Sequence, residues 1–297
     1  MIGMNSNAHY IDLHIHSNCS DGVLSPVQVV ERARAEGLET IAIADHDTVA
    51  GVAEAITAAA KCEIEVIPAV ELSVSYKTWQ DVHLLGYGIQ YDDAVFLAKL
   101  NSFRERREHR NIKILSLVNM RLTEENRATI DLEEVLAYAH DSIGRPHIAR
   151  ALMKRHYVGS MEDAFRRYLV PCNVPKQYWA IEEAIAEIRR LGGLAILAHP
   201  TSMTVDRQEL RLIVHELCEL GLDGLEAYNN LAHADEMEFL RRTAGEMGLA
   251  VSAGSDFHGI EDGLEMGRGR GGIRFSAGLL APLRERLLER EHQLLSR

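Results

Sequence analysis

The sequence predicts an α/β fold, because helix–strand units recur along the chain and the strands are apolar throughout. A helix end, a glycine and a short apolar strand follow one another in residues 33–45, 188–200, 218–229 and 245–256. Glycine is favoured just after a helix because the left-handed conformation costs it little. Alternating strands and helices imply right-handed βαβ units in a parallel sheet, and continuously apolar strands imply that both faces of the sheet are buried.

The first strand and the first helix have clear sequence signals. A strand through His14 and His16 would place both imidazoles on one face, since side chains two residues apart share a face of a strand. The helix after it has Ser25 as the N-cap, Pro26 in the first turn and Gln28 completing a capping box.

The middle of the chain departs from this alternation. Between about residues 92 and 178 no comparable apolar strand occurs, and a long charged segment with apolar residues at helical spacing takes its place. We therefore predict an all-helical lobe inserted into the α/β domain, with residues 9–95 and 179–297 forming the domain and residues 96–178 the lobe. The charge run "RERREHR" at residues 104–110 is expected to be a solvated helix face.

The composition is that of an ordinary globular protein with an acidic balance. The chain carries 32 basic and 44 acidic residues, a formal net charge of −12. Since a polyanion needs a basic surface, we expect no non-specific nucleic-acid binding and no duplex DNA partner, although a local basic cleft stays compatible with this charge. Four cysteines without a Cys-x-x-Cys pair, the lack of a signal-peptide pattern and the absence of a membrane-length apolar run predict a cytoplasmic protein without a membrane partner.

Metal-binding side chains follow strand after strand. Functional groups of α/β proteins gather at the carboxyl ends of the strands, so we expect these side chains to converge. The donors are imidazole nitrogens and carboxylate oxygens, and Cys19 in the first motif has no second thiolate beside it. The candidate ligands are His14, His16, Asp21, His46, Glu71, His83, His199, Asp256 and His258.

This set of donors predicts a site for several metal ions. Nitrogen and oxygen donors suit Mn²⁺, Zn²⁺ or Fe²⁺ and argue against a structural zinc–cysteine site. Nine ligands are too many for one ion, but with Glu71 as a bridge they fit two or three. Such a site can activate water and bind phosphoryl oxygens. Asp12, Asp45 and Asp47 are better suited to be outer partners of the ligands or proton-handling groups.

Six motifs, in order along the chain, resemble those of the PHP (polymerase and histidinol phosphatase) phosphoesterases. They are "DLHIHSNCSDG", "AIADHDT", "AVELS", "HLLGY", "AHP" and "GSDFHG", and they span residues 12–259 outside the lobe. The resemblance implies a distorted (β/α)7 barrel with a trinuclear metal centre, most consistent with Mn²⁺, and all nine ligand positions are filled by matching residue types. We assign catalytic roles to Asp45, Asp47 and His258, the last of which is also a candidate ligand.

The lobe, with "GRPHIAR", "VPK" and "YNN", resembles the stand-alone bacterial PHP proteins that hydrolyse nucleoside 3′,5′-bisphosphates, whose relatives trim short RNA from the 5′ end. We therefore expect hydrolysis of the 3′-phosphate of such bisphosphates, with 5′→3′ exoribonuclease activity on short RNA as the same chemistry on a longer substrate. The alternatives are a phosphatase for a small metabolite such as histidinol phosphate and a non-catalytic metal-binding module. The complete ligand set argues against the second of these.

A doubly phosphorylated substrate needs cationic and polar contacts beside the metal ions. Arg145 and His147 lie next to Pro146 at a predicted helix start, where anions bind well. Lys176 lies where the chain returns from the lobe, and Asn229 and Asn230 follow a strand. An exposed arginine near a helix start and a solvated loop lysine are the structural alternatives.

Overall fold

The computed structural model describes residues 9–138, 144–260 and 263–296. The N-terminal residues 1–8, part of the segment in which we looked for a signal peptide, lie outside this range. The chain divides into two compact units, one formed by residues 1–96 and 178–297 and the other by residues 97–177.

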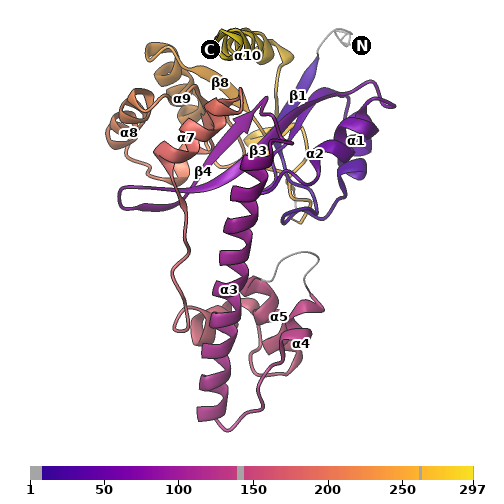
Figure 1. Ribbon diagram of the computed structural model, residues 1–297, viewed down its shortest axis with the longest axis vertical. Coiled ribbons are helices and arrows are strands. Elements are labelled where there is room, and N and C mark those ends of the chain that lie inside the picture. The colour runs from indigo at the N-terminus through magenta and orange to yellow at the C-terminus, as the bar shows by residue number, and fades with distance from the viewer. Residues whose placement is uncertain (1–8, 139–143, 261–262, 297) are drawn as a thin grey trace. The chain divides into compact units, whose positions relative to one another are not determined.

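The first unit combines one large sheet with helices (Figure 1). Its strands are β1 (Tyr10–Ile15), β2 (Leu38–Ile43), β3 (Glu65–Tyr76), β4 (Trp79–Tyr87), β5 (Trp179–Ala180), β6 (Leu194–Leu197), β7 (Gly224–Tyr228) and β8 (Ala250–Ala253), with a separate ladder of β9 (Arg268–Gly269) and β10 (Ile273–Arg274). Its helices are α1 (Pro26–Ala35), α2 (Val52–Ala59), α7 (Ile181–Arg190), α8 (Arg207–Glu219), α9 (Ala234–Glu246) and α10 (Leu280–Leu295).

The predicted parallel sheet needs one correction. The strand order is β1-β2-β3-β4-β6-β7-β8, and β4 runs antiparallel to both β3 and β6 while the other neighbours on this path are parallel. Only Lys77 and Thr78 connect β3 to β4, and a connection of two residues can only reverse the chain direction, since a parallel pair needs a long crossover. The pair lacks the Asn-Gly type of signal that would have identified a hairpin in the sequence.

The first and last strands of the sheet approach each other at their carboxyl ends. Ile15 and Phe257 form a parallel bridge, the Asp256 N–H donates to the His14 carbonyl at 2.8 Å, and the His16 N–H donates to the Phe257 carbonyl at 2.9 Å. These contacts bring the first metal-binding motif next to the last one. Complete closure into a (β/α)7 barrel stays a prediction.

Apolar side chains on both sides of the strands hold the sheet in place. One core cluster joins Leu13, Leu85 and Ile196 of the sheet to Leu280 and Leu283 of α10. A second cluster lies between β1, β2 and the helices α1 and α2. Burial of each large aliphatic side chain contributes roughly 1.5–3 kcal/mol, which explains why these strands are apolar on both faces.

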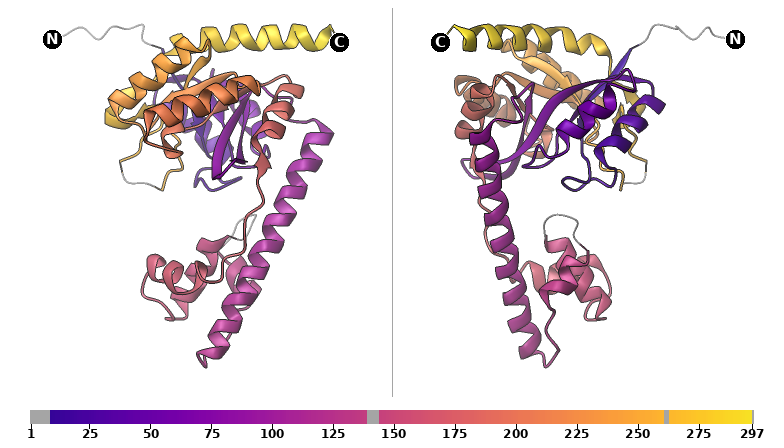
Figure 2. Two further views of the ribbon diagram at one scale, coloured as in Figure 1. Left: turned by 90° about the vertical axis from the view of Figure 1, so that its left-hand side faces the viewer. Right: turned by 45° about the vertical axis from the view of Figure 1, so that its right-hand side comes forward.

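The C-terminal segment covers the amino ends of the strands. The Ile11 N–H donates to the Phe275 carbonyl, and the Ala277 N–H donates to the His9 carbonyl, both at 3.0 Å. From there α10 lies across one end of the unit (Figure 2). The carboxyl ends of the parallel strands, where the predicted ligands lie, are therefore at the opposite end.

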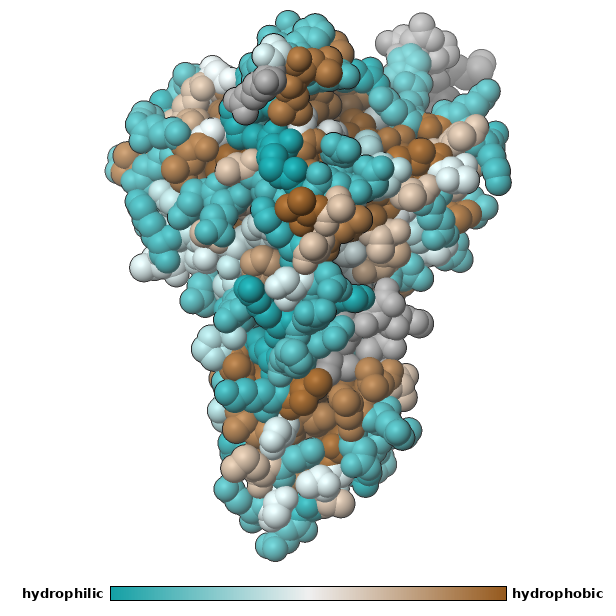
Figure 3. Space-filling model, viewed as in Figure 1, coloured by the Kyte–Doolittle hydropathy of each residue, from teal (hydrophilic) through white to brown (hydrophobic). Residues whose placement is uncertain are grey.

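In the second unit the described residues, 97–138 and 144–177, form helices joined by loops and contain no strand. It contains most of α3 (Ala94–Glu124), α4 (Leu132–Leu136), α5 (Arg145–Lys154), α6 (Met161–Ala164) and a π-helical turn, Phe165–Leu169. Ile114, Val118, Ile148 and Tyr168 belong to its own apolar core. None of residues 101–110 of α3 is buried, which agrees with the solvated helix face that we expected, and this part of α3 is mostly hydrophilic in Figure 3.

Within the described residues, every helix is too short or too polar to cross a lipid bilayer.

Replacing Ser25 by alanine should lower the free energy of unfolding by about 1 kcal/mol. The capping box is present as predicted, with the Gln28 N–H donating to Ser25 Oγ at 3.3 Å and the Ser25 N–H donating to Gln28 Oε1 at 2.9 Å. Urea unfolding would measure the loss, with Glu31→Ala, an exposed site of the same helix, as the control. Equal stability of Ser25→Ala and Glu31→Ala would contradict a stabilising cap.

Candidate metal centre

All nine side chains that the sequence singled out meet at one end of the first unit. Eight of them fall into three overlapping groups whose candidate ligand atoms lie within 4.8 Å of one another. His199 joins them, since its Nε2 lies 3.3 Å from His83 Nδ1. The groups are His16, Asp21, His46 and His258; His14, His16, Glu71 and Asp256; and His46, Glu71 and His83.

Glu71 is at the centre of this cluster and is fully buried. Its Oε2 lies 3.2 Å from Nε2 of His14 and from Nε2 of His16, and 3.1 Å from Nδ1 of His46. Its Oε1 lies 3.1 Å from His83 Nδ1 and 3.2 Å from His199 Nε2. One carboxylate therefore faces five imidazoles, an arrangement that fits a bridge between cations.

The remaining members close the cluster on two sides. Asp256 Oδ1 lies 3.1 Å from His16 Nε2 and 3.4 Å from His14 Nε2. His258 Nε2 lies 3.3 Å from Asp21 Oδ1, and the Asp21 side chain is 50% exposed. The cluster is thus buried around Glu71 and exposed to solvent at Asp21.

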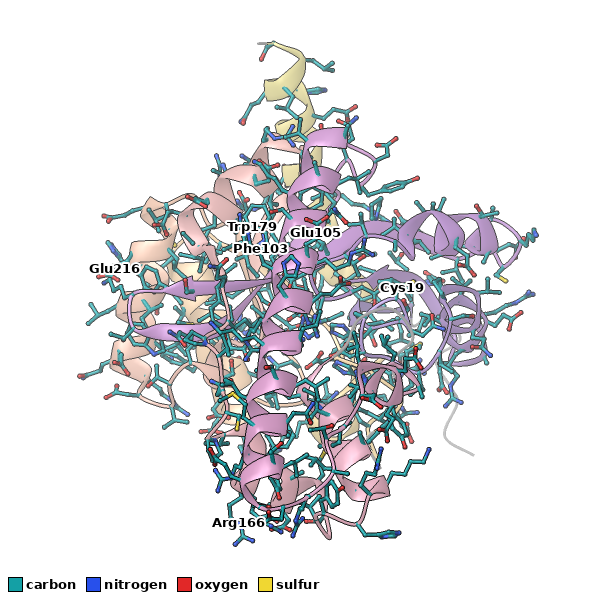
Figure 4. All side chains as sticks on the ribbon, turned by 60° about the horizontal axis from the view of Figure 1, so that its bottom comes forward. Cys19, Phe103, Glu105, Arg166, Trp179 and Glu216 are labelled. Atoms are coloured by element: carbon teal, nitrogen blue, oxygen red, sulfur yellow. The ribbon has the colours of Figure 1, made fainter. Side chains whose placement is uncertain are left out.

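Three candidate metal-ligand atoms of the cluster have no hydrogen-bond partner within the described residues. They are His16 Nδ1, His46 Nδ1 and Glu71 Oε2. In addition, Nε2 of His14 and Nε2 of His16 face each other at 3.1 Å. A buried polar atom without a partner costs about 1–3 kcal/mol, and a cation shared by these atoms would remove that cost. The nitrogen and oxygen donors fit divalent transition metals. Cys19, in the loop after β1 (Figure 4), belongs to none of the three groups.

The charges of the cluster also suit a cation. Burial would raise the pKa of Glu71, but the neighbouring charges of His14, His46 and His83 outweigh burial and hold this pKa well below its usual range. Burial lowers the pKa of His46 to about 3. For His83, burial is outweighed by the Glu71 charge, and the pKa rises to about 10. Protons and metal ions therefore compete for some of these nitrogens, and metal binding should release protons.

The backbone at three of these positions is in an unusual conformation. Asp47, His199 and Asp256 have φ values of 53°, 27° and 55°, in the left-handed region that few non-glycine residues occupy. Such strain persists only where surrounding contacts hold it, and it concentrates at functional sites. The Asp47 N–H donates to the Glu71 carbonyl, and the Asp256 N–H donates to the His14 carbonyl, each at 2.8 Å.

The three aspartates that we predicted to be outer partners or proton-handling groups hold loops around the cluster. Asp12 accepts the N–H groups of Ser255 and Gly267 at 2.9 and 2.7 Å, and burial raises its pKa to about 6. Asp45 accepts three hydrogen bonds, two from Ser17 and one from Ser20.

Asp47 belongs to the same class, because it accepts the Ser73 N–H at 2.9 Å. These contacts fit the role of outer partners. The catalytic assignments of Asp45 and Asp47 stay predictions.

The two asparagines are engaged with the backbone, and the substrate contact that we predicted for them stays a prediction. Asn229 is fully buried, and its Oδ1 accepts the N–H groups of Leu231 and Ala232 at 2.9 and 2.8 Å. Asn230 donates through Nδ2 to the carbonyls of Ser255 and Arg268. The amides stabilise the turn after β7, and a substrate contact by Asn229 would require that turn to open.

The three predicted cationic contacts, Arg145, His147 and Lys176, belong to the second unit. Arg145 begins α5, its Nη1 donates to Asn173 Oδ1 at 3.5 Å, and its guanidinium lies over the Phe165 ring. His147 accepts the Gly144 N–H through Nδ1 at 3.0 Å and so caps α5. Their contacts with a substrate stay predictions.

Sequence reasoning missed Glu226. This residue lies in β7, is fully buried, and contacts two of the nine candidates, with Oε1 2.9 Å from His14 Nδ1 and Oε2 2.8 Å from the His199 N–H. An acidic residue inside the otherwise apolar strand "GLEAY" was the available signal.

Comparison with known proteins agrees with this geometry. A family model described as the PHP domain matches residues 12–192. The chain is 35% identical to a 5′-3′ exoribonuclease of Haemophilus influenzae, over 86% of this chain and 93% of that protein. It is 34% identical to a 3′,5′-nucleoside bisphosphate phosphatase of Chromobacterium violaceum, over 85% and 88%. A solved amidohydrolase structure from Chromobacterium violaceum superposes with a TM-score of 0.76 at 31% identity, covering 95% and 96% of the two chains.

Replacing Gly254 by alanine should destabilise the protein by about 1–3 kcal/mol through overpacking. A Cβ atom there would overlap His14 Cβ and lie 2.7 Å from the His14 nitrogen and 2.9 Å from Glu226 Oε1. The control is Gly245→Ala in α9, where a Cβ would meet no atom within 4 Å and should stabilise the helix by roughly 0.5–1 kcal/mol. Thermal unfolding measures both, and opposite signs are expected. A loss at Gly245 as large as that at Gly254 would contradict the close approach to His14 as the cause.

Proposed function

We propose that this chain, which belongs to the PHP family of metal-dependent phosphoesterases, hydrolyses the 3′-phosphate of nucleoside 3′,5′-bisphosphates and acts by the same chemistry as a 5′→3′ exoribonuclease on short RNA. The family model covers residues 12–192, and the two relatives described above carry these two activities in their names. The observation that carries the proposal is the buried Glu71 carboxylate facing five imidazoles.

The nine candidates would hold two or three divalent metal ions, with Mn²⁺ as our first choice and Zn²⁺ or Fe²⁺ as alternatives. The ions, when bound, would supply Lewis acidity toward phosphoryl oxygens and activate water at neutral pH. Glu71 is suited to bridge because both of its oxygens face ring nitrogens. The first unit is proposed to be a distorted (β/α)7 barrel, which the Ile15–Phe257 bridge supports.

The chain's own side chains would orient the substrate and handle protons. His258 and Asp21 lie 3.3 Å apart, and Asp21 opens to solvent, so this pair can exchange a proton with a bound substrate. Asp45 and Asp47 would contribute to catalysis by fixing, through hydrogen bonds, the segments that carry the candidate ligands. Asp45, for example, binds Ser17 and Ser20 in the loop that carries Asp21.

The second unit has the charge that a phosphorylated substrate requires. Residues 97–177 contain 15 basic and 10 acidic residues, a net charge of +5. The remaining residues contain 17 basic and 34 acidic residues, a net charge of −17, which together make the −12 of the whole chain. Within the described residues Arg145 has no carboxylate at ion-pair distance, which supports it as a contact for the second phosphate. Lys176 is the next candidate.

The substrate class can be tested by phosphate release in the presence of Mn²⁺. The panel would comprise a nucleoside 3′,5′-bisphosphate, a nucleoside 5′-monophosphate, a 2′,3′-cyclic monophosphate, histidinol phosphate and a 5′-phosphorylated oligoribonucleotide. We expect the highest kcat/KM for the bisphosphate and 5′-directed shortening of the oligoribonucleotide. A preference for histidinol phosphate would replace this proposal by that of a metabolite phosphatase, and no hydrolysis of any compound would favour a non-catalytic module.

Glu71→Gln should remove at least one metal ion per chain and abolish phosphate release. The amide keeps the shape of the side chain but loses the negative charge and one of the two acceptor oxygens that face the imidazoles. Elemental analysis after expression with Mn²⁺ should find two or three ions in the natural protein. Glu65→Gln, at the exposed amino end of the same strand, serves as the control. Fewer than one ion in the natural protein, or unchanged content in Glu71→Gln, would contradict the proposed centre.

Arg145→Ala should reduce kcat/KM for the bisphosphate about 10- to 150-fold, which corresponds to the loss of a charge-assisted contact of roughly 1.5–3 kcal/mol. A substrate with a single phosphate has nothing to place there and should lose much less. Lys176→Ala is expected to act in the same direction. Arg150→Ala, an exposed position of the same helix, is the control. Equal losses on both substrates would assign Arg145 to the fold or to the reacting phosphate instead.

A further inference from the structure

Glu226 is a fully buried carboxylate in the middle of β7, and its strand neighbours Leu225 and Ala227 are apolar core residues. An ionised carboxylate is costly in such surroundings unless hydrogen-bond donors satisfy it. Its two oxygens each have one donor: Oε1 faces His14 Nδ1 at 2.9 Å, and Oε2 faces the backbone N–H of His199 at 2.8 Å. The carboxylate therefore joins a ligand candidate from β1 to one from the loop after β6.

The first contact determines which nitrogen of His14 is available to a metal ion. An ionised carboxylate can only accept hydrogen bonds, so His14 Nδ1 must carry the proton. The lone pair is then on Nε2, the atom that lies 3.2 Å from Glu71 Oε2 and 3.4 Å from Asp256 Oδ1. Without Glu226 the proton could reside on Nε2 and block the ligating position.

The second contact holds a strained backbone. His199 has a φ of 27°, and the hydrogen bond from its N–H to Glu226 Oε2 helps to hold this conformation. In this conformation His199 Nε2 lies 3.2 Å from Glu71 Oε1, and Nδ1 lies 3.1 Å from Ser202 Oγ. The absence of a side chain at Gly254 leaves room for this arrangement, because a Cβ there would lie 2.9 Å from Glu226 Oε1.

We propose that Glu226 is a positioning residue of the metal centre, which sets the tautomer of His14 and the backbone of His199 so that both rings direct Nε2 toward Glu71. The inference rests on the proposed metal centre. Carboxylates that orient ligating histidines in this way typically change metal affinity or activity 10- to 100-fold when they are replaced.

The first test compares Glu226→Gln with Asp223→Asn. A glutamine has one acceptor oxygen and one NH₂ group, so it cannot accept from both His14 and His199. Asp223 is also buried, precedes β7 directly, and binds the Ala195 N–H and Arg290, but it has no contact with the nine candidates. Titration of the metal-free full chain with Mn²⁺ should give about 10- to 100-fold weaker binding for Glu226→Gln and unchanged binding for Asp223→Asn, although both variants should unfold at lower temperature.

A second measurement uses the natural protein and does not depend on the variants folding. Nitrogen-15 NMR distinguishes the two tautomers of a neutral histidine, and His14 in the zinc-loaded chain should carry its proton on Nδ1. A proton on Nε2 would overturn the inference, as would equal weakening of Mn²⁺ binding in Glu226→Gln and Asp223→Asn or natural affinity in Glu226→Gln. Failure of the natural chain itself to bind Mn²⁺ or Zn²⁺ would instead overturn the metal centre on which the inference rests.

Discussion

The carboxylate of Glu71 lies within 3.2 Å of ring nitrogens from five histidines, and the architecture of the first unit is what allows these six side chains to meet. They come from the segments of β1, β2, β3, β4 and β6, which lie side by side in the sheet. The helices and apolar clusters that bury both faces of the sheet leave its carboxyl end as the place where polar groups can collect.

Burying so many polar groups costs free energy, and hydrogen bonds from the surrounding residues reduce this cost. Asp12, Asp45 and Glu226 are buried acids that accept hydrogen bonds from loops or ligands around the cluster. His199 and Asp256 adopt left-handed backbone conformations that these contacts hold. The stability of the unit and the geometry of the centre are therefore coupled through the same hydrogen bonds.

The two units have net charges of opposite sign, +5 for residues 97–177 and −17 for the remaining residues. The first unit is strongly acidic and holds the candidate metal ligands, so a phosphorylated substrate would meet repulsion from most of its surface. The second unit is basic, and helix α3 exposes Arg104, Arg106 and Arg107, next to Phe103 and Glu105 of the same helix (Figure 4). Attraction of anions by such a surface extends about 8–10 Å at physiological ionic strength, and it weakens as salt is added.

The sequence alone was sufficient to predict the α/β class, the helical character of the middle segment, the capping box at Ser25 and the family. These features rest on local patterns: periodic apolar residues, glycines after helices, and metal-binding residue types repeated at strand ends. It also pointed to nine side chains that the structure places close together, because imidazoles and carboxylates recur in or shortly after successive apolar strands.

Tertiary structure decided what depends on neighbours distant in sequence. The direction of β4 follows from a two-residue connection without a strong turn signal, so His83 reaches the cluster from within an antiparallel strand. Asn229 follows a strand, and the structure shows that its buried side chain accepts two backbone N–H groups of the turn after that strand. Glu226 lies 212 residues from His14 in the chain, and no local pattern can show that its oxygen faces that ring. The physical reason is the same in each case: a buried polar group is placed by the partners that satisfy it, and only the folded chain brings those partners together.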